Sequence, residues 1–240
     1  MEDILVIEGL NVHYGDFQAI HDVGITVSAG KITSIIGSNG AGKTTLLNAV
    51  MGIHPPDAGS IIFDGKDITN WQTNRIVACG MTMSPEGSNI FEDMSVEENL
   101  LIGAYLPEPR KKIDELLGKA YKLFPMLREK SNQLATFLSG GQRQMLAIAR
   151  SLMSDPKVLI CDEVSLGLAP IIIGDIYEKI AEINESGVTV VLVEQEVKRS
   201  LEHSDFSYVL VKGHVVLGGK SSELPEEEVK DAYFGINEFS

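Results

Sequence analysis

The most informative stretch of this 240-residue chain reads Gly37-Ser38-Asn39-Gly40-Ala41-Gly42-Lys43-Thr44-Thr45. An apolar, partly β-branched run at 31–36 precedes it, and a segment at 46–51 that resembles the start of a helix follows it. Strand, glycine-rich loop and helix form the context in which a match to G-x-x-x-x-G-K-[ST] predicts a phosphate-binding loop. The alternative is an ordinary glycine-rich turn before a core helix.

The residue types of this stretch suit phosphate binding. Gly37, Gly40 and Gly42 let the backbone turn tightly and bring its N–H groups against phosphate oxygens. The N-terminus of the following helix adds N–H donors and the positive end of a dipole. Lys43 can reach the β- and γ-phosphates of a nucleotide, and the Thr44 hydroxyl can ligate Mg²⁺.

Composition limits the classes of protein to consider. At 240 residues with 44% hydrophobic content, the chain fits one α/β domain, or one domain with a subdomain. No apolar run approaches the roughly 18 residues needed to cross a bilayer, and we expect no secretory signal because the first residues lack a basic segment. Cys79 and Cys161 show neither disulfide nor metal-ligand spacing. The 20 basic and 34 acidic residues give a net charge of −14, which argues against nucleic-acid binding.

Hydrophobic patterning predicts strands that alternate with helices, which is typical of a layered parallel core. Predicted strands cover 4–10, 25–27, 32–36, 60–63, 81–83, 157–163 and 188–193, followed by a hairpin of 208–211 and 214–217. Predicted helices cover 71–79, 171–184 and 197–203, and 224–234 is expected to form a last acidic helix or tail.

Residues 87–137 resemble a helical insertion between strands of the core. Ser95 can cap a helix, with Glu98 as its capping-box partner. We expect a break at 107–109, which reads Pro-Glu-Pro, and then an amphipathic helix over 113–123.

A further helix is predicted to open at Leu138-Ser139-Gly140-Gly141-Gln142. A serine followed by two glycines leaves N–H groups exposed at the end of the helix, which suits a second anion-binding site. The alternative is a simple N-cap.

The apolar run 157–163 ends in two carboxylates, Asp162 and Glu163. Such a run suits a parallel strand covered on both faces, and acids at its C-terminal end lie where α/β folds bind ligands. Asp162 can then hold Mg²⁺, and Glu163 can orient or deprotonate an attacking water. The alternative is a solvated strand end.

Together these motifs resemble the ATP-binding cassette (ABC) ATPases along nearly the full length of the chain, and the middle motif, 138–142, is the most specific. The resemblance implies an α/β fold with a P-loop RecA-like parallel core, an N-terminal antiparallel β layer and an inserted helical subdomain. Within a single domain, the core would comprise 1–86 and 157–240, and the helical signature subdomain would comprise 87–156.

The resemblance also implies ligands and partners. ATP and Mg²⁺ would bind at 37–45, and Tyr14 matches the aromatic residue that stacks on adenine, with a lone surface tyrosine as the alternative. Two cassettes, identical or different, would face head to tail and close on two ATP molecules. The helix end of one cassette would then meet the γ-phosphate held by the other through Ser139, Gly140, Gly141 and Gln142.

Three departures from the family pattern affect the expected catalytic and metal-binding set. Glu86 stands where the family has a glutamine that senses Mg²⁺, and a glutamate can still ligate the metal. Gln195 stands where the family has a histidine as the γ-phosphate switch, and its amide can donate a hydrogen bond but carries no positive charge. Ala169 replaces the usual aspartate before Pro170, and Val164 replaces a common proline.

The segments 85–87, 165–170 and 193–195 resemble one branch of the family, the ATPase subunits of branched-chain amino-acid importers, although Ser88 and Val164 depart from that branch. This implies ATP hydrolysis that powers import of such amino acids or of similar small solutes, together with membrane-spanning permease subunits. The chain would then be cytoplasmic and peripheral on the inner face of the membrane, with its permease contact near 87–106.

Three alternatives remain at this stage. The departures at Glu86, Gln195 and Ala169 are compatible with a nucleotide-gated cassette of weak catalysis that acts through its partner. A cassette of DNA repair or translation is disfavoured because we find no coiled-coil insertion or tandem repeat, and because the chain is acidic. An export cassette for lipid or lipopolysaccharide has a similar length, and Gln195 argues against it.

Overall fold

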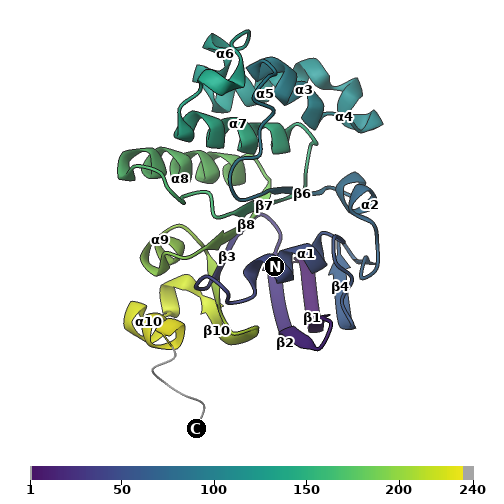
Figure 1. Ribbon diagram of the computed structural model, residues 1–240, viewed down its shortest axis with the longest axis vertical. Coiled ribbons are helices and arrows are strands. Elements are labelled where there is room, and N and C mark those ends of the chain that lie inside the picture. Colours follow the sequence, from purple (N-terminus) through teal and green to yellow (C-terminus); the bar gives the residue numbers. More distant parts are fainter. Residues whose placement is uncertain (1, 235–240) are drawn as a thin grey trace. The chain divides into compact units, whose positions relative to one another are not determined.

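The computed structural model describes residues 2–234, which fall into two compact units (Figure 1). The first unit is formed by Met1–Ile76 and Thr189–Ser240, of which 2–76 and 189–234 are described. The second is Val77–Val188.

The first unit contains an antiparallel sheet in the order β2-β1-β4-β5. These strands are β1 (Asp3–Tyr14), β2 (Phe17–Ser28), β4 (Ala58–Phe63) and β5 (Lys66–Asp67). They confirm the predicted N-terminal β layer, although β1 runs four residues beyond the expected end at Leu10.

A bulge explains how β1 keeps one face buried over this length. Leu5 and Ile7 are buried at the alternating spacing of a strand, and the next buried residues are Leu10 and Val12. The register shifts between Ile7 and Leu10, where Gly9 has φ of 60°. The extra residue restores the inward direction, so the apolar positions on both sides of the bulge face the core.

The first unit also contains the strands β10-β9-β3-β8 in that order. They are β3 (Ile32–Ile36), β8 (Thr189–Glu194), β9 (Phe206–Val211) and β10 (His214–Lys220). β3 runs parallel to both β8 and β9, whereas β9 and β10 form the predicted antiparallel hairpin. Every residue of β3 and β8 is buried, as expected for central parallel strands.

Helices complete the first unit. They are α1 (Lys43–Val50), α9 (Val197–Glu202), the 3₁₀ turn η2 (Ser221–Glu223) and α10 (Glu226–Phe234), while α2 (Thr73–Ala78) crosses the boundary at 76–77. The acidic C-terminal stretch, expected as a helix or a tail, is helical because Val229 is fully buried against Ile36, Val197 and Val209. Helix α10 is therefore part of the hydrophobic core of the first unit.

The second unit pairs two parallel strands, β6 (Met81–Ser84) and β7 (Val158–Asp162), and carries most of the helices. Its helices are α3 (Val96–Gly103), α4 (Pro107–Lys111), α5 (Ile113–Leu123), α6 (Pro125–Glu129), η1 (Ala135–Phe137), α7 (Gly140–Leu152) and α8 (Pro170–Glu185). This unit contains the predicted helical segment 87–156 together with β6, β7 and α8.

Two predictions in this unit had different outcomes. Ser95 caps α3 in a full capping box: Glu98 N–H donates to Ser95 Oγ, and Ser95 N–H donates to Glu98 Oε2, as predicted. The expected break at 107–109 is wrong, because Pro107 is the first residue of α4. A proline suits the first helical turn, where its missing N–H would have no intrahelical partner.

No helix within residues 2–234 is long and apolar enough to cross a membrane.

Two glycines in the second unit should respond oppositely to substitution by alanine. At Gly103, a Cβ would lie 2.0 Å from the carbonyl oxygen of Arg150 on α7, so α3 and α7 would have to separate. We expect Gly103→Ala to lower the free energy of unfolding by about 1–3 kcal/mol. At Gly118 on α5, a Cβ would meet no atom within 4 Å. Gly118→Ala should therefore raise the free energy of unfolding by about 0.5–1 kcal/mol, because alanine favours the helix more than glycine does. Urea unfolding of both variants checks this, and destabilisation by both would contradict it.

Candidate functional site

The predicted phosphate loop lies in the first unit, between β3 and α1, as the sequence indicated. Gly40 has φ of 80° and Gly42 has φ of 106°, both in the region that favours glycine. Gly37 is required for a different reason: a Cβ there would lie 2.7 Å from the carbonyl oxygen of Leu210. These three glycines therefore serve backbone conformation and close packing.

Hydrogen bonds from neighbouring strands hold the loop at both ends. Gly37 N–H donates to the Glu194 carbonyl at the end of β8 (3.1 Å). Gly213 N–H, in the β9–β10 turn, donates to the Ala41 carbonyl (2.8 Å), and the Gly213 carbonyl accepts from His21 N–H of β2 (2.9 Å). The loop is thus fixed by β8 at one end and at the other by the β9–β10 turn, which β2 holds in its turn, so the backbone of the loop is positioned before any ligand arrives.

Lys43 lies folded over this loop. Its side chain is only 5% exposed, and its Nζ donates to the carbonyls of Gly37 (2.8 Å) and Ser38 (3.1 Å). Within the described residues, no side chain caps the N-terminus of α1, while Thr44 in its first turn is exposed. An ammonium group and a helix N-terminus therefore meet at one loop, an arrangement that attracts phosphate.

Gln195 lies close to the loop in the same unit. The register of the parallel strands pairs Ile36 with Glu194, and Gln195 follows directly after β8. Because Gly37 N–H bonds to the Glu194 carbonyl, the next residue, the half-buried Gln195, lies beside the start of the phosphate loop. Its amide can donate a hydrogen bond to an anion there.

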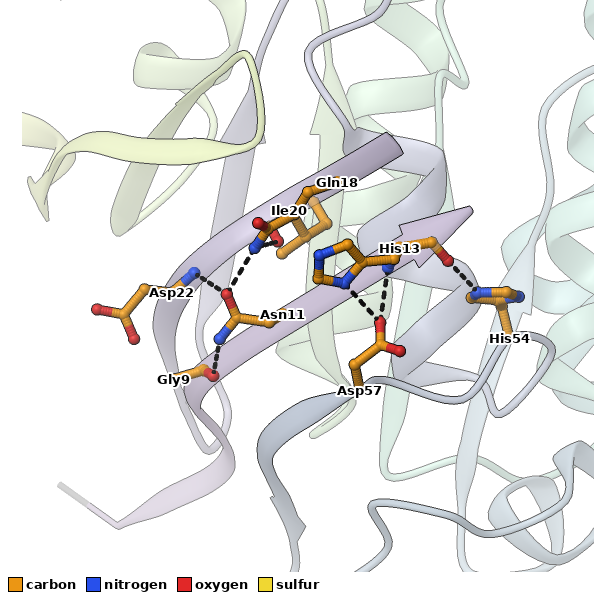
Figure 2. A network of polar contacts seen from close by, with 8 residues as sticks. All are labelled: Gly9, Asn11, His13, Gln18, Ile20, Asp22, His54 and Asp57. Carbon is orange, nitrogen blue, oxygen red and sulfur yellow. Dashed lines mark hydrogen bonds and ion pairs between the residues drawn. The ribbon is translucent and has the colours of Figure 1, made fainter. Parts of the chain in front are cut away.

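Tyr14, the predicted adenine-stacking residue, is the last residue of β1 and is 45% exposed. Its ring stacks on His54, with ring centroids 4.5 Å apart and an interplanar angle of 29°. Figure 2 shows the contacts around His54: its Nε2 bonds to the His13 carbonyl (3.0 Å), and Asp57 accepts from the N–H (2.7 Å) and Nδ1 (2.9 Å) of His13. The hydrogen bond from the His13 side chain lowers the pKa of Asp57. Sequence reasoning missed His54 and Asp57.

The second unit holds the two predicted acids at the end of β7. Asp162 is 5% exposed and Glu163 is 8% exposed, so both are nearly buried. Glu163 has φ of 48°, a left-handed conformation that is unfavourable for a residue with a side chain. Such strain persists only where the surroundings impose it, and it is common at functional sites. The alternative of a solvated strand end does not fit this burial.

Glu86 and Glu163 share a cavity of about 430 Å³ within this unit. The parallel register pairs Ser84 with Cys161, so these two acids follow the ends of β6 and β7 at equivalent positions. The cavity is also lined by Gly140 of the predicted signature motif. Three predicted site positions from distant parts of the sequence are thus brought together.

The loop after Glu86 is held by α7 in a way that the sequence did not reveal. Gly87, Ser88 and Asn89 all have positive φ, at 77°, 63° and 40°. Ser88 Oγ donates to Gln144 Oε1 (2.6 Å), and Arg150 Nη2 donates to the Asn89 carbonyl (2.9 Å). Partial burial lowers the pKa of Arg150 without removing its charge.

The signature helix α7 begins at a capping box. Gln142 N–H donates to Ser139 Oγ (3.4 Å), and Ser139 N–H donates to Gln142 Oε1 (3.1 Å). The N-cap alternative is therefore realised, while the anion-binding role of this helix end stays a prediction. A Cβ at Gly141 would lie 2.3 Å from Ile172 Cγ2, so the second glycine permits close contact of α7 with α8.

The residues available for Mg²⁺ fit an ion that arrives with its nucleotide. Among residues 2–234, no group of three or more His, Cys, Asp or Glu side chains could hold a metal ion. Mg²⁺ does not need such a cage, because it is usually bound by one or two carboxylates together with phosphates and water. Asp162 of the second unit is a nearly buried carboxylate and Thr44 of the first unit is an exposed hydroxyl residue, so each by itself has the chemistry of such a ligand, and their role stays a prediction.

Comparison with known proteins gives consistent results. The ABC transporter family model matches residues 20–165. The high-affinity branched-chain amino acid transport ATP-binding protein BraG of Pseudomonas aeruginosa is 41% identical over 97% of this chain and 100% of its own length. The lipopolysaccharide export system ATP-binding protein LptB of Escherichia coli is 33% identical, over 96% and 97%. The crystal structure of the ADP conformation of MJ1267, an ATP-binding cassette of an ABC transporter, superposes with a TM-score of 0.84 at 32% identity, covering 98% of this chain and 96% of that one.

The contact of Gly141 with Ile172 gives a test by double substitution. Gly141→Ala should lower the free energy of unfolding by about 1–3 kcal/mol, because the new methyl group overlaps Ile172 Cγ2. Adding Ile172→Ala removes that group, so the two effects should couple by at least about 0.5 kcal/mol in urea unfolding. Gly140→Ala is the control, since its Cβ would lie 3.4 Å from the flexible end of Leu168. Strict additivity of the two substitutions would contradict the contact.

Proposed function

The chain belongs to the ABC transporter family as an ATP-binding, ATP-hydrolysing subunit, and we propose that it powers the import of branched-chain amino acids or similar small solutes. The observation that carries the solute proposal is the full-length similarity to a branched-chain amino acid transport protein. The alternative, an export cassette, is supported by a relative of lower identity, LptB. An export cassette is expected to have a histidine at the switch position, where this chain has Gln195.

The phosphate loop supplies the binding half of the proposed mechanism. Its N–H groups lie in a loop already held by β8 and the β9–β10 turn, and they receive the β- and γ-phosphates without large reorganisation. Lys43 exchanges its bonds to the Gly37 and Ser38 carbonyls for bonds to phosphate oxygens. Tyr14 offers the exposed part of its ring to the base.

Glu163 supplies the hydrolytic half. We assign it to accept a proton from the attacking water as that water's oxygen bonds to the γ-phosphorus and the bond to ADP breaks. Its strained backbone fixes the carboxylate at the cavity that it shares with Glu86. Thr44, Asp162 and Glu86 are the residues predicted to bind Mg²⁺, which would supply positive charge to the phosphates when bound. Gln195 would donate a hydrogen bond to the γ-phosphate.

Partners follow from the same proposal. A second cassette, identical or different, would present its own helix end of Ser139 to Gln142 to the nucleotide. Permease subunits would dock on 87–106, where Phe91 and Met94 are 47% and 37% exposed. The chain would thus be peripheral on the cytoplasmic face of the membrane, with ATP and Mg²⁺ as its ligands and no nucleic acid.

A cassette of weak catalysis is the second candidate, and Ala169 favours it. This residue is the N-cap of α8, and it makes no side-chain cap hydrogen bond in the described part of the chain. An aspartate there, as in the family pattern, would have both capped α8 and carried a negative charge. Steady ATPase activity of the purified cassette, alone and with its partner, would exclude this candidate.

Two substitutions separate binding from hydrolysis. Glu163→Gln should leave ATP affinity within about twofold while lowering the hydrolysis rate about 10²- to 10⁴-fold, because the general base is lost. Lys43→Ala should weaken ATP binding itself, since the ammonium group no longer meets phosphate. Equilibrium binding measures the ATP affinity, and phosphate release measures the hydrolysis rate. The control is Glu185→Gln, which alters an exposed residue at the end of α8. Unchanged turnover in Glu163→Gln would refute the assignment of the base.

The solute is tested in the assembled transporter. With its permease and partner subunits in proteoliposomes, the chain should drive ATP-dependent uptake of leucine, isoleucine or valine, and Glu163→Gln should abolish that uptake. ATP-dependent movement of lipopolysaccharide instead would overturn the import proposal while leaving the ATPase assignment intact.

A further inference from the structure

His54 occupies an unusual position for a residue outside the predicted motifs. It lies in the segment that follows α1, and its backbone N–H donates to the Asn48 carbonyl of that helix (3.2 Å). Its ring stacks on Tyr14 at 4.5 Å. One residue therefore joins the helix that follows the phosphate loop to the ring expected to meet the base.

The hydrogen bonds fix the orientation of the His54 ring. Its Nε2 lies 3.0 Å from the His13 carbonyl, which can only accept, so Nε2 carries the hydrogen (Figure 2). Asp57 holds His13 from the other side, through both the backbone N–H and the ring Nδ1. Asp57 N–H in turn donates to the Asn11 carbonyl of β1 (2.8 Å). The end of β1 is thus pinned to the segment 54–57.

This arrangement covers one face of the Tyr14 ring and leaves much of the residue exposed. His54 stacks on the ring, and 45% of Tyr14 remains exposed to solvent. A planar base that stacks on the ring face opposite His54 would complete a stack of three rings: base, Tyr14 and His54. Because His54 already restrains the Tyr14 ring, that ring loses less conformational freedom when a base binds than a ring that is free to rotate would lose.

We infer that His54 is a positioning residue for base recognition, which acts through Tyr14 and sets the separation between the base and the phosphates. The inference rests on the proposed function, since it requires a nucleotide whose phosphates bind at 37–45. It assigns to the segment after α1 a role in selecting adenine nucleotides over phosphate ligands that lack a base. His54 itself need not touch the nucleotide.

Two conservative variants separate the ring from the hydrogen bond. His54→Phe keeps a ring for the stack but loses the donor to His13, whereas His54→Gln keeps an N–H donor but loses the ring. His54→Ala removes both. We expect His54→Ala to weaken ADP binding to the full chain about three- to tenfold by calorimetry, and we expect His54→Phe to recover most of that loss. Full recovery by His54→Gln and none by His54→Phe would overturn the stacking role.

Inorganic pyrophosphate distinguishes positioning from a merely structural effect, because it carries two phosphates and no base. Its affinity should be unchanged in all three variants if His54 acts on the base. An equal loss for ADP and pyrophosphate would show that the substitution disturbs the loop at 37–45, and would overturn the inference. If the unaltered chain binds neither ligand, the proposed function fails as well; if it binds both and His54→Ala is silent, the inference alone fails.

A double substitution tests whether His54 acts through Tyr14. In a Tyr14→Ala background, His54→Ala should cause no further loss of ADP affinity, because the ring that it positions is gone. Independent, additive losses would contradict the inference. His203→Ala, at an exposed histidine after α9, serves as the control and should leave ADP affinity within twofold of the unaltered chain.

Discussion

The hydrogen bond from Gly37 N–H to the Glu194 carbonyl is the contact that sets where the phosphate loop of the first unit begins. It continues the parallel pairing of β3 with β8 by one step into the glycine-rich loop, so the loop starts in a fixed direction. Both strands are buried along their whole length, and the hydrophobic effect therefore holds the pairing in place. The chemistry of Lys43 and of the α1 N-terminus follows from this placement.

The second unit uses a related construction with different polar groups. The buried strand β7 ends at Asp162 and Glu163 follows it directly, while the adjacent strand β6 leads to Glu86. Burial of the strand again fixes where the polar residues emerge, and here the backbone of Glu163 is forced into an unfavourable conformation. In each unit, therefore, an apolar strand determines the position of the polar side chains that follow it.

Local patterns were sufficient to predict much of this. The glycine-rich loop, the capping box of Ser95 and the strand that ends at Asp162 all depend on neighbours in sequence, and the structure contains each of them. The break expected at 107–109 was wrong because a proline can open a helix as well as end one. The stack of Tyr14 on His54 and the bond of Ser88 to Gln144 join residues 40 or more positions apart, and no local pattern indicates such contacts.

The capping box at α7 has a consequence for the kind of ligand that this helix end can accept. Gln142 Oε1 and a lone pair of Ser139 Oγ are both engaged by backbone N–H groups of the same turn. The hydroxyl hydrogen of Ser139 and the amide hydrogens of Gln142 are not needed for the cap. The N-terminal end of α7 therefore keeps its side-chain hydrogen-bond donors available, while its side-chain acceptors are each engaged by one backbone N–H. We therefore expect this helix end to favour an oxyanion over an ammonium or metal cation of equal size, in keeping with the predicted anion-binding role.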